Sequence, residues 1–285
     1  MVNWHVISEV GTVHSGIGAG NVLGCPYLFV AGRNQSAPDE TADAGRGGRV
    51  WIGIPQDGNL FSDTRWKWNM RWEPLFQVRD DLQTDVAPTV AAPWGIPVVF
   101  VKTAGDGRIF YTSYELGQPT PWREVGGMTD QPLAASGASF NGKTYLYLFK
   151  RNPIDGQVYY TRSGDRGESK AWETWRVIPG ELKTKKSPAA AMMPAPGGRI
   201  LCVFAKRENN TLAYTATLDG VRWSAWRDLV VNNAPVQLLG RLAPTAFTWQ
   251  DSIYVPFVPP KLDTTVVKAA VLTPVVQDDK VVNAQ

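Results

Sequence analysis

Trp122-Arg-Glu-Val125, Trp175-Arg-Val-Ile178 and Trp226-Arg-Asp-Leu229 each place a tryptophan at the start of a short, strand-like segment. Trp72-Glu-Pro-Leu75 has the same form. The four tryptophans recur about every 50 residues, a spacing typical of propellers and other repeat arrays. A fifth such segment, Trp4-His-Val-Ile7, stands near the N-terminus, whereas the chain after Trp226 has none in that phase. The pattern predicts a repeat whose last unit is completed by the N-terminal segment.

Each repeat contains four strand-like segments. In the second repeat they are a small-residue segment at 87–93, an apolar one at 97–102, an aromatic one at 108–114 and the tryptophan segment at 122–125. Gly105-Asp106-Gly107 separates the second from the third and is a strong hairpin signal. Short β-branched and aromatic runs divided by Gly, Pro, Asn and Asp are typical of many short strands.

The third and fourth repeats align with the second when their central phenylalanines are superposed. The aligned phenylalanines are Phe100, Phe149 and Phe204, and the turn residues that then share a column are Asp106, Asp155 and Asn210. The first repeat has the same skeleton with a long loop at 31–48, and the fifth lacks its fourth strand.

These units predict an all-β fold, namely a five-bladed β-propeller with four antiparallel strands per blade. We expect a single domain over 1–285, with blades at about 18–78, 85–127, 131–180, 187–230 and 241–274. The segment at 3–10 is expected to close the ring, which would remove an exposed sheet edge. The tail after Pro274 is expected either to form an extra strand or to lack regular structure.

Composition limits the function classes. Lys and Arg total 29 against 26 Asp and Glu, a near balance with no long basic run, so nucleic acid is not expected as a partner. No apolar stretch is long enough to predict a membrane span, and the N-terminus does not resemble a signal peptide. Cys25 and Cys202 fall in repeats that should not be neighbours, so no disulfide is expected. We expect a cytoplasmic protein, with release without a signal left open.

The fourth repeat carries a resemblance to a known family. Its segments Arg199-Ile-Leu-Cys-Val-Phe204, Leu212-Ala-Tyr214 and Trp223-Ser-Ala-Trp226 resemble the blade repeat of bacterial and fungal propeller lectins. The similarity is greatest to Photorhabdus-type lectins and looser to fucose-binding lectins. This resemblance implies sugar binding in clefts between adjacent blades, by an aromatic platform and polar side chains.

Catalytic carboxylates are not found where a propeller glycosidase would need them. Such enzymes place two carboxylates on either side of one bond, but the predicted innermost strands carry none. Asp85 and Asp130 lie just before two of these strands, at the expected mouth of the channel. The histidines and cysteines are not spaced as metal ligands. No catalytic residue, cofactor or metal is therefore predicted.

Two tryptophans fall outside the repeat phase and are the first candidates for ligand binding. Trp94 and Trp249 each come at the turn after a first strand, where they would either contact a sugar or cap the core. His14 is expected in the loop between the closing strand and the first blade, either solvated or available for hydrogen bonding. Trp66, with the loop at 31–48, would modify the rim of the first blade.

Basic side chains recur beside the turns between second and third strands. Lys102, Arg151 and Lys206 are candidate ligand-binding residues there, although charges at turn tips are commonly just solvated. Asp106 and Asp155 are expected to serve turn geometry. Asp85 and Asp130 complete the candidate set.

Three functions remain open from the sequence. The first is a carbohydrate-binding propeller lectin without catalysis, whose partner is a glycan or another small molecule. The second is an enzyme of small-molecule metabolism, glycoside-processing or cyclase-like, that uses the axial pocket with His14, Asp85, Asp130 or nearby tyrosines as acid or base. The third is a protein-interaction scaffold. The sequence leaves the oligomeric state open.

Overall fold

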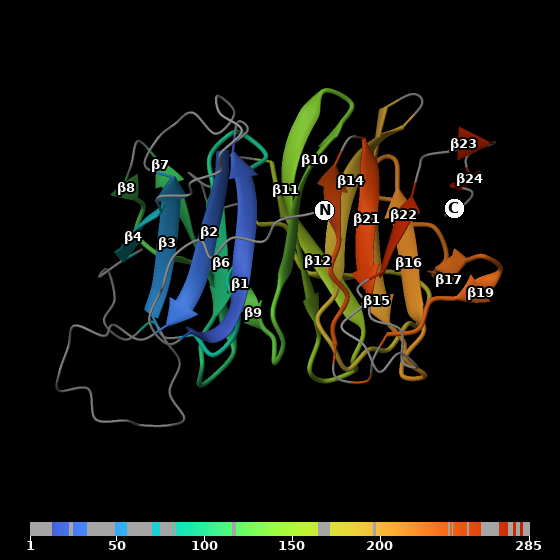
Figure 1. The fold of residues 1–285 in the computed structure, drawn as a ribbon, viewed down its shortest axis with the longest axis horizontal. Helices are drawn as coiled ribbons and strands as arrows, with labels where there is room; N and C mark the ends of the chain where they lie inside the picture. The colour runs from blue at the N-terminus through green and yellow to red at the C-terminus, as the bar shows by residue number, and fades with distance from the viewer. Residues whose placement is uncertain are drawn as a thin grey trace. The chain divides into compact units, whose positions relative to one another are not determined.

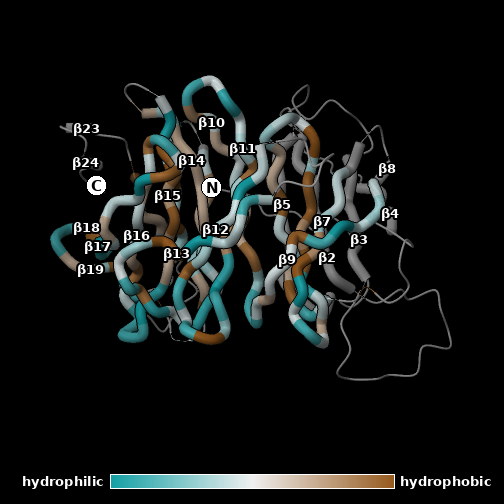
Figure 2. The backbone as a smooth tube through the Cα atoms, turned by 180° about the vertical axis from the view of Figure 1, so that it is seen from behind, coloured by the Kyte–Doolittle hydropathy of each residue, from teal (hydrophilic) through white to brown (hydrophobic). Residues whose placement is uncertain are grey.

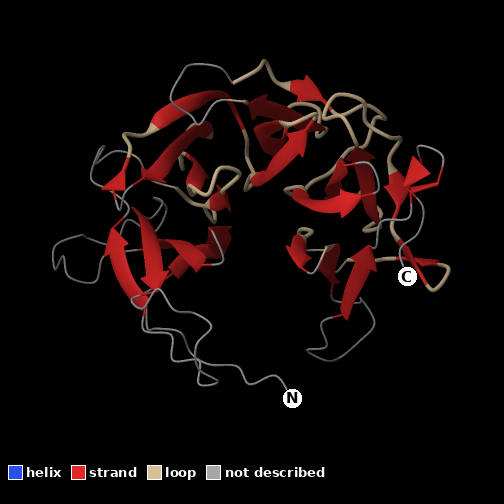
Figure 3. Ribbon diagram, turned by 90° about the horizontal axis from the view of Figure 1, so that it is seen from above, coloured by secondary structure: helices blue, strands red, loops and turns tan. Residues whose placement is uncertain are grey.

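A computed structural model describes most of the chain. It covers residues 13–22, 25–32, 49–55, 70–74, 82, 84–115, 118–164, 172–195, 198–238, 240, 242–249, 251–257, 268–272, 276–277 and 280–281. The described residues form strands, turns and loops without a helix (Figure 3). No helix long and apolar enough to cross a membrane occurs among them. The chain divides into two compact units, Met1–Met128 and Thr129–Gln285.

The first unit holds two antiparallel sheets. Sheet 1 has the strand order β1-β2-β3-β4, with bounds β1 Val13–Val22, β2 Cys25–Gly32, β3 Arg49–Pro55 and β4 Met70–Pro74. Sheet 2 has the order β5-β6-β7-β8 with β9 also paired to β7, and comprises β5 Thr89–Ala91, β6 Val98–Lys102, β7 Arg108–Glu115, β8 Gln118–Pro119 and β9 Arg123–Met128. The two-residue strand β8 is an addition that the sequence pattern did not predict.

The second unit holds two four-stranded sheets and one of three strands. Sheet 3 comprises β10 Ala134–Phe140, β11 Lys143–Arg151, β12 Val158–Ser163 and β13 Arg176–Val177. Sheet 4 comprises β14 Ala189–Ala195, β15 Gly198–Lys206, β16 Leu212–Thr217 and β17 Arg227–Asp228. Sheet 5 comprises β20 Phe247–Trp249, β21 Ser252–Phe257 and β22 Lys268–Leu272. Each pairs its strands in chain order, as Figure 1 shows for β14, β15 and β16.

The remaining strands are short. A hairpin of β18 Val230–Val231 and β19 Ala234–Pro235 follows sheet 4. The tail forms a second small hairpin, β23 Val276–Gln277 with β24 Lys280–Val281, which is one of the two outcomes expected for it. The predicted closing segment at 3–10 lies outside the described residues, and β22 is the last strand of sheet 5 among those described.

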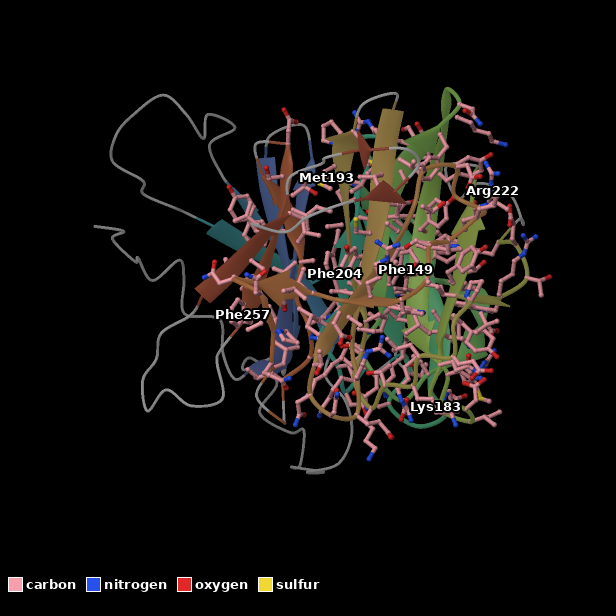
Figure 4. The ribbon with its side chains drawn as sticks, turned by 90° about the vertical axis from the view of Figure 1, so that its right-hand side faces the viewer. Phe149, Lys183, Met193, Phe204, Arg222 and Phe257 are labelled. Atoms are coloured by element: carbon pink, nitrogen blue, oxygen red, sulfur yellow. The ribbon has the colours of Figure 1, made fainter. Side chains whose placement is uncertain are left out.

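The aligned phenylalanines form equivalent cross-strand pairs, which confirms the alignment of repeats two to four. Phe100 pairs with Tyr111, Phe149 with Tyr160, and Phe204 with Tyr214. All three phenylalanines are fully buried. Figure 4 shows Phe149 and Phe204 in the middle of the strands of sheets 3 and 4, and Figure 2 shows β15 as a hydrophobic strand.

One column of that alignment needs a correction at the turn. The Oδ1 atoms of Asp106 and Asp155 accept hydrogen bonds from the amides of the second residue after each. In sheet 4 the residue that does this is Asn209, which accepts from Thr211 N at 3.0 Å, and not Asn210. Asn210 instead adopts φ 70, like Gly156 at φ 72. The turn of sheet 4 is one residue shorter, and asparagine tolerates the left-handed conformation better than most residues.

One of the repeated tryptophans, Trp226, packs between neighbouring sheets, as predicted. Trp226 is 9% exposed and belongs to a core cluster with Phe149 and Tyr160 of sheet 3 and Val203 of sheet 4. Gly180 lies directly against its ring, because a Cβ atom there would approach Trp226 Cδ1 at 3.0 Å. Trp226 therefore has a structural role in the packing of sheet 3 against sheet 4.

Candidate functional site

The structure brings the predicted basic and acidic residues together in pairs. Lys102 Nζ forms an ion pair with Asp85 Oδ1, although the lysine is only 4% exposed. Arg151 Nη1 lies 2.7 Å from both carboxylate oxygens of Asp130. In each pair the acidic residue precedes the first strand of a sheet and the basic residue ends the second strand. The ion pair therefore fastens the segment leading into the sheet to the strand beside it.

Two of the basic residues also reach the segment that leads into the next sheet. Arg151 Nε donates to Thr184 O at 2.7 Å, and Lys206 Nζ donates to Gly240 O at 2.6 Å. Burial, and then the charge of Lys186, lower the pKa of Lys206. Lys102, Arg151 and Lys206 therefore all have partners within the protein. That these three side chains bind a ligand stays a prediction.

The other predicted site residues are placed as follows. Trp94 is half-buried in the turn between β5 and β6, and Trp249 ends β20, directly before the turn to β21. Trp94 thus lies in the turn after a first strand, as predicted, whereas Trp249 is the last residue of its first strand. The expectation for His14 was wrong, because it lies in β1 where the pairing with β2 becomes irregular between Val13 and Ile17. Trp66 lies outside the described residues.

A hydrogen bond of the same kind occurs in sheets 2, 3 and 4 and identifies equivalent positions in the three sheets. In sheets 2, 3 and 4 a threonine of the third strand donates its hydroxyl to a backbone carbonyl of the segment leading to the fourth strand. The pairs are Thr112 with Thr120 O, Thr161 with Glu173 O, and Thr215 with Ser224 O. Each contact is accompanied by a backbone bond to the next residue of the third strand, at 2.8, 3.0 and 2.9 Å respectively. The structure thus matches these positions independently of residue type.

At those matched positions sheets 2 and 4 carry small polar or apolar side chains. Ser113 and Thr120 occupy them in sheet 2, where Ser113 N donates to Thr120 Oγ1. Ala216 and Ser224 occupy them in sheet 4, where Ala216 N donates to Ser224 Oγ. These hydroxyl contacts close the fourth-strand segment onto the third strand without any charged group.

Sheet 3 replaces this arrangement with a charged and aromatic cluster. Arg162 stands in the place of Ser113 and Ala216, and Glu173 in the place of Thr120 and Ser224. The cross-strand partner of Arg162 is Tyr147. The residues equivalent to Tyr147 are Val98 in sheet 2 and Cys202 in sheet 4. Tyr145 stands two residues before Tyr147 on the same strand. We call Tyr145, Tyr147, Arg162 and Glu173 the sheet 3 cluster.

Arg162 is the centre of this cluster. Its Nε donates to Glu173 Oε1 at 2.7 Å, and its Nη1 donates to Tyr147 Oη at 3.0 Å and to Gly220 O at 3.2 Å. Its guanidinium carbon lies 4.6 Å from the ring centroid of Tyr145. Burial alone would lower the pKa of Arg162, but the hydrogen bonds to Tyr147 and Glu173 outweigh it and raise that pKa. The arginine therefore stays charged.

Tyr147 and Gly220 join the cluster to the neighbouring sheet. Tyr147 is fully buried, and its hydroxyl donates to Gly220 O at 3.1 Å. Burial raises the pKa of Tyr147 to about 12, and the hydrogen bond from Arg162 opposes this rise. Gly220 has φ 73, and a Cβ atom there would overlap the Tyr147 hydroxyl and lie 2.8 Å from Phe140. Only glycine fits this approach.

The loop that carries Gly220 is held by Asp219. The carboxylate of Asp219 accepts hydrogen bonds from Val221 N at 2.9 Å, Arg222 N at 2.7 Å and Arg222 Nε at 2.6 Å. Burial would raise the pKa of Asp219, but the hydrogen bonds from Arg222 and Val221 outweigh it and hold the pKa well below its usual range. Figure 4 shows Arg222 and Lys183 toward opposite ends of the strands. The cluster therefore lies away from the end that carries the Arg151 ion pair.

The cluster offers both hydrogen-bond directions next to an aromatic ring. Arg162 has five N–H donors, of which the contacts above engage three, and its Nη2 makes no hydrogen bond to any residue that the structure describes. The side chains of Arg162 and Glu173 remain 14% and 34% exposed. A hydroxyl-bearing ligand could therefore accept from Arg162, donate to Glu173 and place an apolar face near Tyr145.

None of the four residues of the sheet 3 cluster was predicted from the sequence to bind a ligand. The signal was present in the aligned repeats, because a column with Ser113 and Ala216 holds an arginine in the third repeat. A position in which one repeat alone carries charge is a more specific sign of function than a charge that recurs at every turn. Phe140 of sheet 3 ends its first strand at the position that Trp249 has in sheet 5.

Comparison with known proteins supports the fold. Neither a protein-family model nor a curated protein matches the chain. Among solved structures, SapL1 lectin in complex with alpha methyl fucoside matches with a TM-score of 0.56 at 12% identity, covering 90% of this chain and 76% of that one. A mutant Aleuria aurantia lectin in complex with Fucalpha1-6GlcNAc matches with a TM-score of 0.52 at 12% identity, covering 90% and 91%. The chain thus has an all-β fold like that of fucose-binding β-propeller lectins.

Proposed function

We propose that this protein is a carbohydrate-binding lectin without catalytic activity and that the sheet 3 cluster binds the sugar. The observation that carries the proposal is the charged pair of Arg162 and Glu173, beside Tyr147 and Tyr145, at positions where sheets 2 and 4 carry small side chains. The Thr161 contact that fastens the fourth-strand segment is retained, so the charged pair is not needed for strand attachment. Both solved lectins named above were crystallised with fucose-containing sugars, which agrees with a glycan ligand.

The alternative of a glycosidase with carboxylates on the first strands has less support. The first strands of all five sheets, with the bounds given above, contain no aspartate or glutamate. Asp85 and Asp130, the nearest candidates, are ion-paired with Lys102 and Arg151. Both carboxylates are thus engaged by basic side chains of the protein itself, which does not favour a role in proton transfer to a substrate.

The proposed function is tested by labelling the protein and measuring its binding to a glycan array. We expect at least one glycan to bind, and Arg162→Gln to weaken that binding by about tenfold or more because the planar donor set is lost. The matched control is Arg207→Gln, since Arg207 forms a 2.8 Å ion pair with Asp228 at the surface of sheet 4 without an adjoining tyrosine. A glycan profile that Arg162→Gln leaves unchanged would place the site elsewhere, and no bound glycan would reject the function.

The predicted aromatic sites are tested on the same array. Trp94→Ala and Trp249→Ala are expected to reduce binding only if those residues form further sugar sites. A loss with either variant, in a protein that remains folded, would extend the proposal to that turn. Unchanged binding would leave the sheet 3 cluster as the proposed site.

We also propose that the five sheets are the blades of one propeller that the N-terminal strand completes. The support is that β22 pairs only with β21 among the described strands, and that the Trp4-His-Val-Ile7 segment resembles the fourth-strand segments of the other repeats. Deletion of residues 1–10 is expected to lower the unfolding midpoint in urea clearly. An unchanged midpoint would contradict closure by this segment.

A further inference from the structure

We propose that the sugar bound at the sheet 3 cluster carries a negatively charged group, a carboxylate or a sulfate. This inference rests on the proposed function. The first support is the charge around the cluster. Lys143, Arg162 and Arg176 provide three positive charges, and Glu173 is the carboxylate that faces them.

Glu173 is itself neutralised by the two arginines. Its Oε1 accepts from Arg162 Nε at 2.7 Å, and its Oε2 lies 3.5 Å from Arg176 Nη2. Both carboxylate oxygens thus have a cationic neighbour, so the repulsion that Glu173 would exert on an anionic ligand is largely compensated. The positive charge that remains is available to a ligand.

Lys143 is the residue best placed to provide that charge. It is exposed at the start of β11, and its Nζ lies 5.2 Å from the ring centroid of Tyr145, which Arg162 Cζ approaches at 4.6 Å. No described carboxylate lies within ion-pair distance of Lys143, whereas Arg222, at the adjacent loop, is paired with Asp219 at 2.6 Å. Two cations gathered at one ring, of which the lysine has no carboxylate partner among the described residues, are suited to an anionic group.

Gly164 is what lets Lys143 lie there. A Cβ atom at Gly164 would stand 2.8 Å from Lys143 Cε, 3.1 Å from Lys143 Nζ and 3.3 Å from Tyr145 Cε1. The absence of a side chain at this position therefore leaves room for the lysine beside the ring. Gly164→Ala would displace the flexible end of Lys143 without changing any charge, which provides a test that is independent of deleting the lysine.

The experiment compares three forms of one oligosaccharide, namely the neutral parent, a derivative with a terminal glucuronate and a sulfated derivative. We expect one or both charged forms to bind about tenfold more tightly than the parent and to lose that advantage as NaCl is raised from about 50 to about 500 mM. Lys143→Gln and Gly164→Ala are expected to remove most of the advantage. Lys183→Gln, an exposed lysine toward the opposite end of the strands, should retain it.

The three oligosaccharides and the variants distinguish between the possible ligands. Preference for the glucuronate alone assigns a carboxylate ligand, and preference for the sulfated form alone assigns a sulfate. Equal binding of neutral and charged forms, or a preference that survives both Lys143→Gln and Gly164→Ala, would overturn the anionic ligand and leave the lectin function intact. No binding of any form, together with an empty glycan array, would overturn both proposals.

Discussion

Arg162 Nη1 donates a hydrogen bond of 3.0 Å to the hydroxyl of Tyr147, the residue opposite it across the β11–β12 strand pair. The same hydroxyl donates to Gly220 O, which belongs to the loop after β16. One buried phenol therefore links a surface arginine to the neighbouring sheet. The link makes the position of Arg162 depend on the packing of two sheets, which is a form of preorganisation for a binding group.

Tyr147→Phe is expected to lower the free energy of unfolding by about 1–2 kcal/mol, because it leaves Gly220 O and Arg162 without a hydroxyl partner. The effect should depend on pH. Burial raises the pKa of Tyr147 from 10.0 to about 12, so its contribution is complete below pH 10 and is lost as the pH rises toward 12. Urea unfolding at about pH 8 and about pH 11 should show the gap between wild type and variant narrowing. A gap of constant size would contradict the raised pKa.

Gly220→Ala is expected to destabilise the protein by about 2–4 kcal/mol, since the new methyl group would meet the Tyr147 hydroxyl as well as straining a backbone at φ 73. Gly142→Ala is the matched control, because Gly142 has φ 74 and open space around it. It should cost only about 1 kcal/mol of backbone strain. Equal losses in thermal unfolding would mean that the close approach to Tyr147 contributes nothing.

Asp85→Asn is expected to lower the free energy of unfolding by about 1–3 kcal/mol, because Lys102 is 4% exposed and would lose its counter-charge. Lys185→Ala removes an ion pair of 3.7 Å to Glu208 from a side chain that is 76% exposed, and should change stability by less than about 0.5 kcal/mol. Chemical denaturation of both variants measures the difference. A stable Asp85→Asn protein with weaker glycan binding would return Asp85 to the list of ligand-binding candidates.

Trp226→Ala is expected to cost about 3–5 kcal/mol, because the indole fills the contact between sheets 3 and 4. Trp226→Phe should recover part of that loss. If both variants kept full stability and lost sugar binding instead, the repeated tryptophans would be a row of ligand sites rather than packing residues.

Asp219→Asn is expected to weaken the loop that presents Gly220 and to reduce stability by about 1–2 kcal/mol near neutral pH. The pKa of Asp219 is lowered in the folded protein, so its contribution is present above the ordinary value of 3.8 and is lost as the pH falls through the folded value. The difference between wild type and variant should therefore shrink as the pH falls from about 4 to about 2. An unchanged difference over that range would reject the lowered pKa.

The strands could be predicted because the signals for them are local. A short apolar run such as that in β11 and an Asp-Gly turn such as that at Asp155 act within a few residues, so the order of strands in sheets 1 to 5 was confirmed. Asn210 was misplaced because a turn shortened by one residue changes which asparagine accepts the amide. His14 was misplaced because nothing in the sequence marks an irregular extension of β1.

The candidate site could not be predicted in the same way, since its contacts join distant segments. Tyr147 and Gly220 are far apart along the chain, and the hydrogen bond between them exists only because sheet 4 packs on sheet 3. Lys102 and Arg151 looked like turn-tip charges, yet their partners come from the segments before β5 and β10 and, for Arg151, before β14 as well.

The threonine contact that recurs in sheets 2, 3 and 4 attaches the fourth-strand segment through its backbone and not through its side chains. Thr112, Thr161 and Thr215 each donate to a backbone carbonyl, and this contact is kept in sheet 3, where Glu173 replaces the side-chain hydroxyls of Thr120 and Ser224. The side chains next to this contact can therefore differ from sheet to sheet while the backbone attachment stays the same. If the proposed function holds, the number of sugar sites is set by the side chains of individual sheets and not by the number of sheets.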